Sequence, residues 1–569
     1  MQKKIFISLS ILSFLFYLSA CKSGTSANDS IATDPVTIAA GEKSFNVNCS
    51  GCHNFRQDAI GPQLSGLTND FPADWIQNFI KDPQQLINSR DAHAVQLHEK
   101  YKTMMPSFSW LKDHEIKSII AFIHSHKENR RPEANKNDNA ISNPIPDSIK
   151  LSGLIANLQL VMQIPASSDS GKSPLARITE MKIQPGTKDL FVVDLRGRLY
   201  RLRNNKPVVY MDMAKLKPKF INEPGLATGF GSFAFHPDFF KNGLLYTTHT
   251  EAAGSGNADF GYADSIKVAL QWVLTEWKVN DPKAETFSGT GRELLRINMV
   301  SGIHGVQDIA FNPLSKKGNE DYGLLYIGVG DGGAVENGYQ FLAHDKGKTW
   351  GTILRIDPAG RNSTNGQYGI PKTNPFVEDK NAMGEIYAYG FRNPHRFTWS
   401  KNGEMVAFNI GHSNIESINL IEPGHDYGWP IREGNFVINP YGDLKRIYSL
   451  PANDTIYKIT YPVAEYDHDE GKAISGGYEY LGTIPAIKGK LLFGDIPTGR
   501  LFYVDMTDLK QGEFATIKEW RVSLNGVVTT LKQVCGNDRV DLHFGRDAKG
   551  ELYLLTKADG KIYELVSVK

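Results

Sequence analysis

The stretch FAFHPDFFKNGLLYTTH, residues 233–249, consists of two apolar segments on either side of a turn. Proline, aspartate, asparagine and glycine stand between the segments and favour turns, whereas the flanking aromatic and branched residues favour strands. The same strand, turn and strand pattern recurs along the chain at intervals of tens of residues. Clear copies are MKIQPGTKDLFVVDL, IAFNPLSKKGNEDYGLLYIGVG, FTWSKNGEMVAFNIG and LHFGRDAKGELYLLT, which begin at Met181, Ile309, Phe397 and Leu542, and a looser copy, IKGKLLFGDIPTGRLFYV, begins at Ile487.

A single unit of this kind cannot bury both of its faces, so the units must stack on one another. Six copies stacked radially predict an all-β propeller of six blades, which we place at residues 156–569. A β-sandwich is the structural alternative, but it does not explain the recurrence.

Near the front of the chain, residues 48–55 read NCSGCHNF. Two cysteines separated by two residues and followed by a histidine are the attachment signature of c-type haem. Cys49 and Cys52 would form the thioether bonds, and His53 would be the proximal iron ligand. The alternatives are a redox dithiol or half of a zinc site, but no second Cys/His pair with zinc-site spacing follows.

The segment MMPSFSWLKDHEIKSIIAFIHSH, residues 104–126, resembles the end of a small class I cytochrome c. Its last part has a helical period of apolar residues: Ile116, Ile119, Ile120 and Ile123. The resemblance implies a methionine before proline as the sixth haem ligand, which is Met105, with Met104 as the runner-up. We therefore predict a small all-α cytochrome c domain at residues 37–127, followed by a polar, proline-bearing linker at 128–155.

The first residues have the features of an export signal. Lys3 and Lys4 precede an apolar stretch, and the ending Leu18-Ser19-Ala20-Cys21 resembles a bacterial lipobox. We expect a signal peptide at 1–20, a lipid on Cys21, and a tether at 21–36 that holds the protein to a membrane facing the periplasm or the cell surface. An ordinary secretory signal is the alternative, and it also implies export.

The 569 residues carry a formal net charge of +1, which gives no electrostatic case for nucleic acid or an anionic membrane as a partner. The length favours two or more domains. Of the four cysteines, only Cys535 has no evident task, so a disulfide framework is not expected.

Functional side chains stand where the predicted propeller strands end. They are His304, Arg392, Asn393, the Gly411-His412 pair and Arg539. A histidine with arginines and an asparagine could bind an anionic, redox-active cofactor, although each residue could also be structural. Gly330-Asp331-Gly332-Gly333 is read as a strand-end turn, because no helix opens after it.

Five motifs together resemble the soluble glucose/sorbosone dehydrogenase family over residues 156–569: FAFHPDF, GDGG, YAYGFRNPHRFTW, INLIEPGHDYGWP and the final GELYLLTKADGKIYEL. The resemblance implies a six-bladed propeller that binds pyrroloquinoline quinone (PQQ) and calcium and oxidises aldoses. It implies that His304 is the catalytic base, that Arg392, Asn393 and Arg539 contact PQQ, and that the carbonyls of Gly411 and His412 bind calcium.

The chain departs from the family pattern around this site. Ala227 stands for a glutamine, Ile303 for an aspartate, Pro497 for a lysine and Asp541 for a second arginine, and Gln307-Asp308 replaces a Gly-Arg pair. These departures reduce the positive charge available to the carboxylates of PQQ.

The combined prediction is a PQQ- and calcium-dependent dehydrogenase of an aldose or related sugar or alcohol that passes electrons to its own haem, and from there to a downstream acceptor. One alternative is an electron-transfer lipoprotein whose propeller is a non-catalytic module that binds glycan or protein. Another is an oxidoreductase with a different cofactor, or none, in the propeller. The enzyme reading requires His304, Arg392, Asn393 and Arg539 to meet in one pocket.

Overall fold

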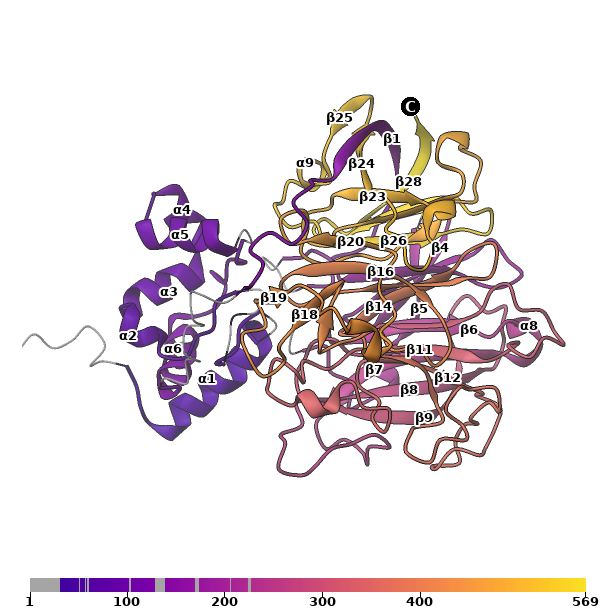
Figure 1. Ribbon diagram of the computed structural model, residues 1–569, viewed down its shortest axis with the longest axis horizontal. Helices are drawn as coiled ribbons and strands as arrows, with labels where there is room; N and C mark the ends of the chain where they lie inside the picture. The colour runs from indigo at the N-terminus through magenta and orange to yellow at the C-terminus, as the bar shows by residue number, and fades with distance from the viewer. Residues whose placement is uncertain are drawn as a thin grey trace, which may run out of the picture.

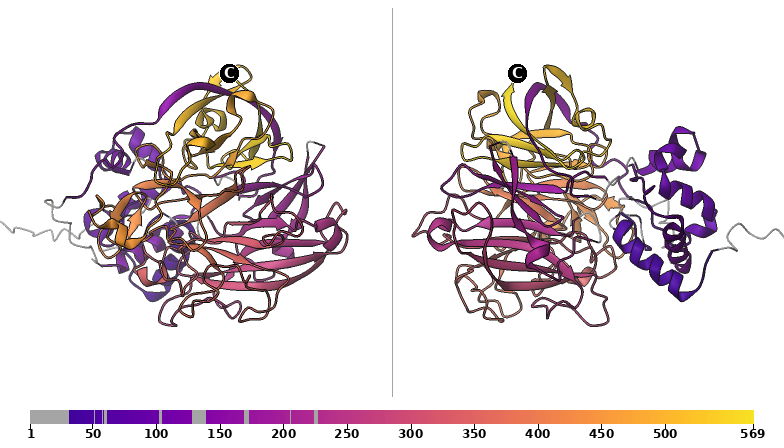
Figure 2. Two further views of the ribbon diagram at one scale, coloured as in Figure 1. Left: turned by 45° about the vertical axis from the view of Figure 1, so that its right-hand side comes forward. Right: turned by 180° about the vertical axis from the view of Figure 1, so that it is seen from behind.

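The computed structural model describes residues 31–50, 52–56, 58, 61–101, 104–127, 139–168, 173–204, 206–223 and 227–569. A small helical region lies beside a large β region (Figures 1 and 2). The predicted signal peptide and Cys21 lie outside the described residues. Within the described ranges, no helix has the length and apolar character needed to cross a membrane.

The helical region contains α1 (Pro35–Asn48), α2 (Leu67–Asp70), α3 (Ala73–Lys81), α4 (Pro83–Asn88), α5 (Ala92–Tyr101) and α6 (Asp113–Ser125). Asp34 caps α1 by accepting the Thr37 N–H at 2.9 Å. Gly41 marks the crossing of α1 and α6, because a Cβ there would lie 1.9 Å from the Ser118 carbonyl oxygen. The periodic isoleucines of α6 are all buried, as predicted.

The strands that the structure describes include six four-stranded antiparallel units. In chain order their bounds are β2 (Ile178–Ile183), β3 (Leu190–Asp194), β4 (Arg198–Arg203) and β5 (Lys206–Asp212); β6 (Phe230–Phe235), β7 (Leu244–Ala252), β8 (Leu270–Val279) and β9 (Gly289–Met299); β10 (Asp308–Phe311), β11 (Leu325–Val329), β12 (Thr352–Ile356) and β13 (Ile386–Tyr389); β14 (Pro394–Trp399), β15 (Met405–Asn409), β16 (Ile415–Ile421) and β20 (Ala464–Asp467); β21 (Tyr478–Glu479), β22 (Lys490–Gly494), β23 (Leu501–Asp505) and β24 (Lys518–Leu524); and β26 (Leu542–Arg546), β27 (Leu552–Thr556), β28 (Lys561–Val568) and β1 (Lys150–Gln163).

Smaller elements connect these units. They are a three-stranded sheet of β17 (Arg432–Glu433), β18 (Phe436–Ile438) and β19 (Ile447–Tyr448), the strand β25 (Val527–Thr529), the helices α7 (Met213–Leu216), α8 (Phe239–Asn242) and α9 (Leu531–Cys535), and short 3-10 turns at Gln340–Leu342, Asp454–Tyr457, Pro485–Ile487 and Met506–Asp508.

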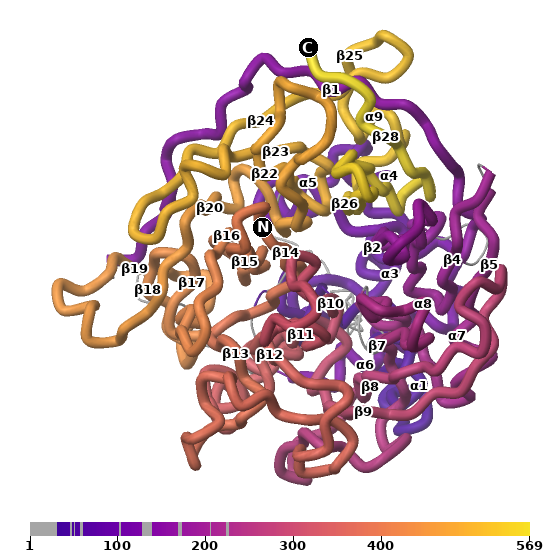
Figure 3. The backbone as a smooth tube through the Cα atoms, turned by 90° about the vertical axis from the view of Figure 1, so that its right-hand side faces the viewer, coloured from indigo at the N-terminus to yellow at the C-terminus, as the bar shows by residue number. Residues whose placement is uncertain are grey.

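The six units follow one another around the β region in chain order (Figure 3). Their inner strands contact in a ring, from β2 through β6, β10, β14, the β21–β22 hairpin and β26. The ring closes where Met181 of β2 pairs with Gly545 of β26. This arrangement confirms the predicted fold class, a small all-α domain followed by an all-β propeller.

Five of the sequence copies are the two inner strands of their units, for example β6–β7 for the copy at Phe233. The looser copy at Ile487 is different, because it covers β22–β23, the second and third strands of the fifth unit. Its inner strand, β21, is only two residues long, too short to leave a repeat signal in the sequence.

Part of the predicted linker is structured. The strand β1 begins at Lys150, inside the 128–155 segment, and pairs with β28 and with β24. It thereby supplies the outer strand of the last unit. Further back, Ile141 bridges to Ile447 and Ile145 packs on the core of the β17–β19 sheet, so the chain contacts the propeller before β1 begins.

Candidate functional site

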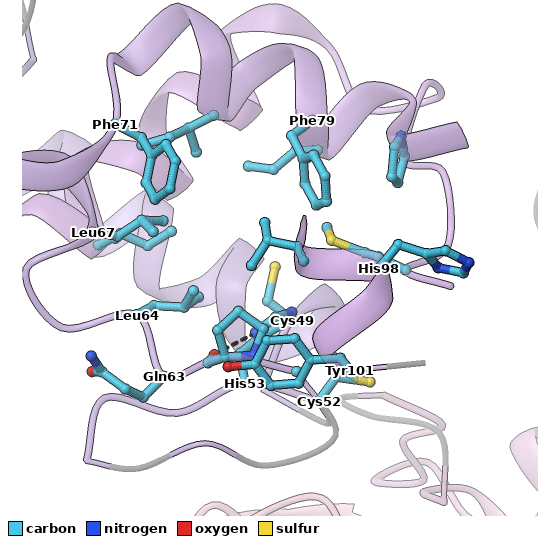
Figure 4. A pocket seen from close by; sticks show the side chains of 18 of the residues that line it. Cys49, Cys52, His53, Gln63, Leu64, Leu67, Phe71, Phe79, His98 and Tyr101 are labelled. Atoms are coloured by element: carbon cyan, nitrogen blue, oxygen red, sulfur yellow. Dashed lines mark hydrogen bonds between the residues drawn. The ribbon is translucent and has the colours of Figure 1, made fainter. Parts of the chain in front are cut away.

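The helical region encloses a cavity of about 310 Å³ lined by the haem-attachment motif and by apolar side chains. Phe71 and Phe79 face the motif residues across this cavity (Figure 4). Cys49 and Cys52 line it together with His53. A largely hydrocarbon cavity with two thiols and one imidazole on its wall fits a covalently attached haem.

The His53 ring is oriented by its neighbours. Its Nδ1 atom lies 2.8 Å from the Pro62 carbonyl oxygen, to which it donates, and this leaves Nε2 free to bind iron. A Cβ on Gly61 would lie 2.4 Å from the ring, so only glycine fits there. Met104 and Met105 both line the cavity, and Met105 as sixth ligand stays a prediction.

A second cavity, of about 160 Å³, lies in the propeller. It is lined by all six residues that the sequence singled out there: His304, Arg392, Asn393, Gly411, His412 and Arg539. Each stands in a loop at the end of a strand, where a propeller places residues near its axis. The requirement that these loops meet in one pocket is therefore satisfied.

His304 is held by Asp331, a residue that the sequence analysis treated only as part of a turn. The His304 Nδ1 atom lies 2.8 Å from Asp331 Oδ1. Asp331 is fully buried and also accepts the Trp429 Nε1–H at 3.0 Å and the Gly333 N–H at 2.9 Å. A carboxylate that accepts these bonds fixes the hydrogen on Nδ1 of the histidine and leaves Nε2 as an acceptor.

Two close approaches keep the His304 backbone in place. His304 has a φ of 49°, in the left-handed region. A Cβ on Gly330 would lie 2.3 Å from the His304 carbonyl oxygen, and a Cβ on Gly305 would lie 2.0 Å from Trp272 Nε1. The GDGG segment therefore serves the histidine, and this role was hidden because the segment lies close to His304 in space but far from it in the sequence.

The guanidinium of Arg392 is hydrogen-bonded to other groups of the protein. It donates to the Gly411 carbonyl and to the carboxylate of Glu336, a residue that sequence reasoning missed. Burial works against the charged form of Glu336, but Arg392 and His412 overcome it and hold the pKa of this carboxyl well below its usual range. Glu336 therefore places a negative charge on the cavity wall.

The Gly411-His412 loop is shaped by Glu433, which is buried. Its Oε1 atom accepts four backbone N–H groups, those of His412, Ser413, Asn414 and Ile415, at 2.7–3.1 Å. A Cβ on Gly411 would lie 1.8 Å from the Ile415 carbonyl oxygen. The loop thus needs both the glycine and the carboxylate to keep its turn.

The cavity contains more positive charge than the sequence indicated. Arg177, Lys472 and Lys557 also line it, and they come from three different units of the propeller, so no local pattern could have grouped them. Of the family departures, Ala227, Ile303, Gln307 and Asp541 line the cavity too. Asp541 binds the Nε of Arg539 at 2.8 Å.

A third cavity, of about 460 Å³, lies between the helical region and the propeller and shares lining residues with both of the others. It is lined on one side by the haem motif and on the other by Arg177, Asp541 and neighbouring residues. Arg539 lines all three cavities. The haem cavity and the propeller cavity are therefore separated by no more than the reach of one arginine side chain.

Direct contacts hold the helical region against the propeller. Lys445 Nζ lies 2.6 Å from Asp58 Oδ2 and 4.6 Å from the centre of the Tyr101 ring. Arg56 Nη1 donates to the Asn337 carbonyl oxygen at 2.8 Å. Asp58 and Arg56 follow His53 closely in the sequence, so these contacts fix the haem motif itself to the propeller.

Comparison with known proteins gives two family matches. The model described as Glucose / Sorbosone dehydrogenase matches residues 175–564, and the model described as Cytochrome c matches residues 38–127.

Among individual proteins, HIPL1 protein of Arabidopsis thaliana is 29% identical over 376 residues, which are 58% of this chain and 52% of that protein. Quinoprotein glucose dehydrogenase B of Acinetobacter calcoaceticus is 25% identical over 342 residues, 55% of this chain and 64% of that protein. The chain thus spans between half and two thirds of the length of these relatives. A solved structure described as a glucose dehydrogenase has a TM-score of 0.52 at 18% identity, over 72% of this chain and 99% of that one, and it supports the propeller fold.

Proposed function

Because the chain belongs to the Glucose / Sorbosone dehydrogenase family and also carries a cytochrome c domain, we propose that it is a PQQ-dependent dehydrogenase of an aldose or related sugar or alcohol with a built-in electron acceptor. Electrons would pass from the propeller to the covalent haem and then to a periplasmic or membrane acceptor. Lipid anchoring through Cys21, on the periplasmic or outer face of a bacterial membrane, completes the proposal.

The observation that carries the proposal is the position of Arg539, which lines the haem cavity, the propeller cavity and the space between them. Electron transfer between two cofactors becomes intramolecular when both are held in one chain at short separation. The ion pair of Lys445 with Asp58 also supports intramolecular transfer, because it holds the haem motif against the propeller.

The proton chemistry belongs to His304. When bound, the quinone supplies a two-electron acceptor and the haem a one-electron acceptor. His304 Nε2 is the free acceptor on the cavity wall, so it takes the proton of the substrate hydroxyl. Asp331 keeps the imidazole in the correct orientation and stabilises its charge after it has taken the proton.

The remaining residues bind and orient. Arg392 and Asn393 would contact the quinone oxygens, and Arg539 would face the cofactor from the haem side. In the structure, the Arg392 guanidinium donates hydrogen bonds to Glu336 and to the Gly411 carbonyl. Calcium, which we include in the proposal, would bind the carbonyls of Gly411 and His412 once the guanidinium has released the first of them.

One observation favours the alternative, a non-catalytic binding propeller. The charge of Arg392 is already neutralised by the buried carboxylate of Glu336, whereas a quinone site needs that charge for its ligand. In this reading the cytochrome would transfer electrons and the propeller would bind glycan or protein.

The test is optical. The haem-loaded, oxidised protein is mixed with PQQ and Ca²⁺, and aldoses and polyols are screened by the reduced haem band. We expect haem reduction that needs PQQ, Ca²⁺ and a substrate, and that His304→Ala removes while dithionite still reduces the haem. Failure of every substrate together with no measurable PQQ binding would favour the binding propeller.

A further inference from the structure

Lys557 is a buried cation for which the described residues of the protein supply no partner. It follows β27 directly, is 9% exposed and lines the propeller cavity. Among the described residues, none offers its Nζ a hydrogen-bond acceptor or a carboxylate within bonding distance. Buried charges in proteins are normally paired, because removing an ammonium from water is costly. An unpaired one at a cavity wall therefore points to a ligand.

The charges around Lys557 do not compensate it. Asp541 faces it and so do Arg177, Arg539 and Arg396, but the carboxylate of Asp541 is already bound by Arg539. Burial lowers the pKa of Lys557 to about 8, opposed by Asp541 and assisted by the three arginines. At pH 7 the side chain is therefore still largely charged.

The adjoining wall carries further polar atoms that have no hydrogen-bond partner among the described residues. His543 is 1% exposed and, among the described residues, has no partner for either ring nitrogen, and Nε2 of His395 also lacks one. Burial holds the pKa of both imidazoles well below the usual value, so both are neutral at pH 7. Buried polar groups in native proteins almost always find partners, so this wall is built for something polar that enters the cavity.

We propose that Lys557 is the ammonium that binds a carboxylate of the ligand in the propeller cavity, in place of the arginine that the family pattern has where this chain has Asp541. The inference rests on the proposed function and goes beyond it by naming the anchoring residue. The carboxylate belongs either to PQQ, which carries three, or to an acidic sugar such as a uronic acid. Lys557 then supplies from the end of β27 the charge that position 541 lacks.

The unpaired charge of Lys557 is also expected to lower the stability of the ligand-free protein while it favours ligand binding. Without a ligand, the folded protein bears an uncompensated charge, so Lys557→Met is expected to leave the melting temperature of the ligand-free protein unchanged or higher. Because the folded pKa is lowered, the cost is fully present below about pH 8 and disappears as pH rises towards the ordinary lysine value.

The experiment measures equilibrium binding of PQQ to the full-length, haem-loaded protein by fluorescence quenching. Lys557→Met is compared with Lys557→Arg, which keeps the charge, and with Lys549→Met, an exposed lysine on the turn between β26 and β27. We expect Lys557→Met to weaken PQQ binding by about 10- to 100-fold, and the other two variants to stay near the wild type. Wild-type binding should weaken above about pH 8 while that of Lys557→Arg stays constant.

A second arm compares galacturonate with galactose on the PQQ-loaded protein. If Lys557→Met spares PQQ but weakens galacturonate alone by about 10-fold or more, the bound carboxylate is that of the sugar, and the assignment of Lys557 stands. If the wild type binds PQQ and Lys557→Met changes neither ligand, the inference is overturned while the proposed function survives. If the wild type binds neither PQQ nor galacturonate, both are overturned.

Discussion

The two cavities of this protein have walls of opposite character. The haem cavity is walled largely by hydrocarbon, with two thiols and an imidazole from one short motif. The propeller cavity is walled by charges, among them Arg177, Glu336, Arg392 and Lys557, which come from separate units. One ligand would be held by a few covalent and metal bonds, the other by many weaker polar contacts.

This difference determines how strongly each site responds to the loss of one residue. Loss of the proximal histidine changes the haem site abruptly, because a hydrocarbon wall offers the iron no replacement ligand. Loss of one polar contact from a set of several weakens binding or catalysis by degrees. The three predictions below test this contrast, from the largest effect to the smallest.

The largest effect is expected for His53→Ala. Without the proximal ligand the haem spectrum should be lost or strongly altered, and sugar-dependent haem reduction should be abolished, because His53 is the imidazole that follows the two cysteines and that the Pro62 carbonyl orients. Sugar oxidation with a soluble artificial acceptor should continue. His114→Ala, an exposed histidine of α6, is the control. Retention of a normal haem spectrum in His53→Ala would contradict the assignment.

Asp331→Asn should have the next largest effect. The amide keeps the shape but can no longer hold the hydrogen on His304 Nδ1 as a carboxylate does, so kcat should fall by about 10²- to 10³-fold. The artificial acceptor is used for this measurement, so that haem transfer does not limit the rate. Haem content and PQQ affinity should stay the same, as they should in the exposed control Asp508→Asn. A loss confined to KM would show that Asp331 shapes binding instead.

The contrast also explains what the sequence could predict. The haem motif is local, so NCSGCHNF was enough to find Cys49, Cys52 and His53, and the repeats at Phe233 and Ile309 were enough for the propeller. Asp331 and Glu336 were missed because their partners, His304 and Arg392, lie 27 and 56 residues away along the chain. Nothing in the sequence distinguished Lys557 from other lysines. It is unusual because it is buried without a partner among the described residues, and only the structure shows this.

Lys445→Met should have the smallest effect. It removes the partly buried ion pair with Asp58 between the two regions, which should slow sugar-dependent haem reduction by about 3- to 10-fold. Turnover with the artificial acceptor should be unchanged, and Lys488→Met, an exposed lysine, is the control. Equal losses with both acceptors would mean that Lys445 serves the propeller chemistry rather than docking.

The effect of Lys445→Met should not depend on pH near neutrality. Burial opposes the charged form of Asp58, but Lys445 outweighs it and keeps the pKa of this carboxyl lowered. The contribution of Asp58 is then complete above the ordinary aspartate pKa and is lost as pH falls through the lowered value. Burial also lowers the pKa of Lys445, so the pair is lost again as pH rises through that value. Between about pH 5 and pH 8 the ratio of wild-type to variant rates should therefore be constant.

The loop from Asp331 to Gly338 serves both halves of the protein at once. It orients His304 through Asp331, balances Arg392 through Glu336, and receives Arg56 of the haem motif at the Asn337 carbonyl, where a Cβ on Gly338 would lie 1.9 Å from the Arg56 guanidinium. The cytochrome and the propeller are consequently not interchangeable modules. A cytochrome grafted onto the propeller of a relative would need this loop as well as the linker, and changes in the loop during evolution would alter proton transfer and docking together.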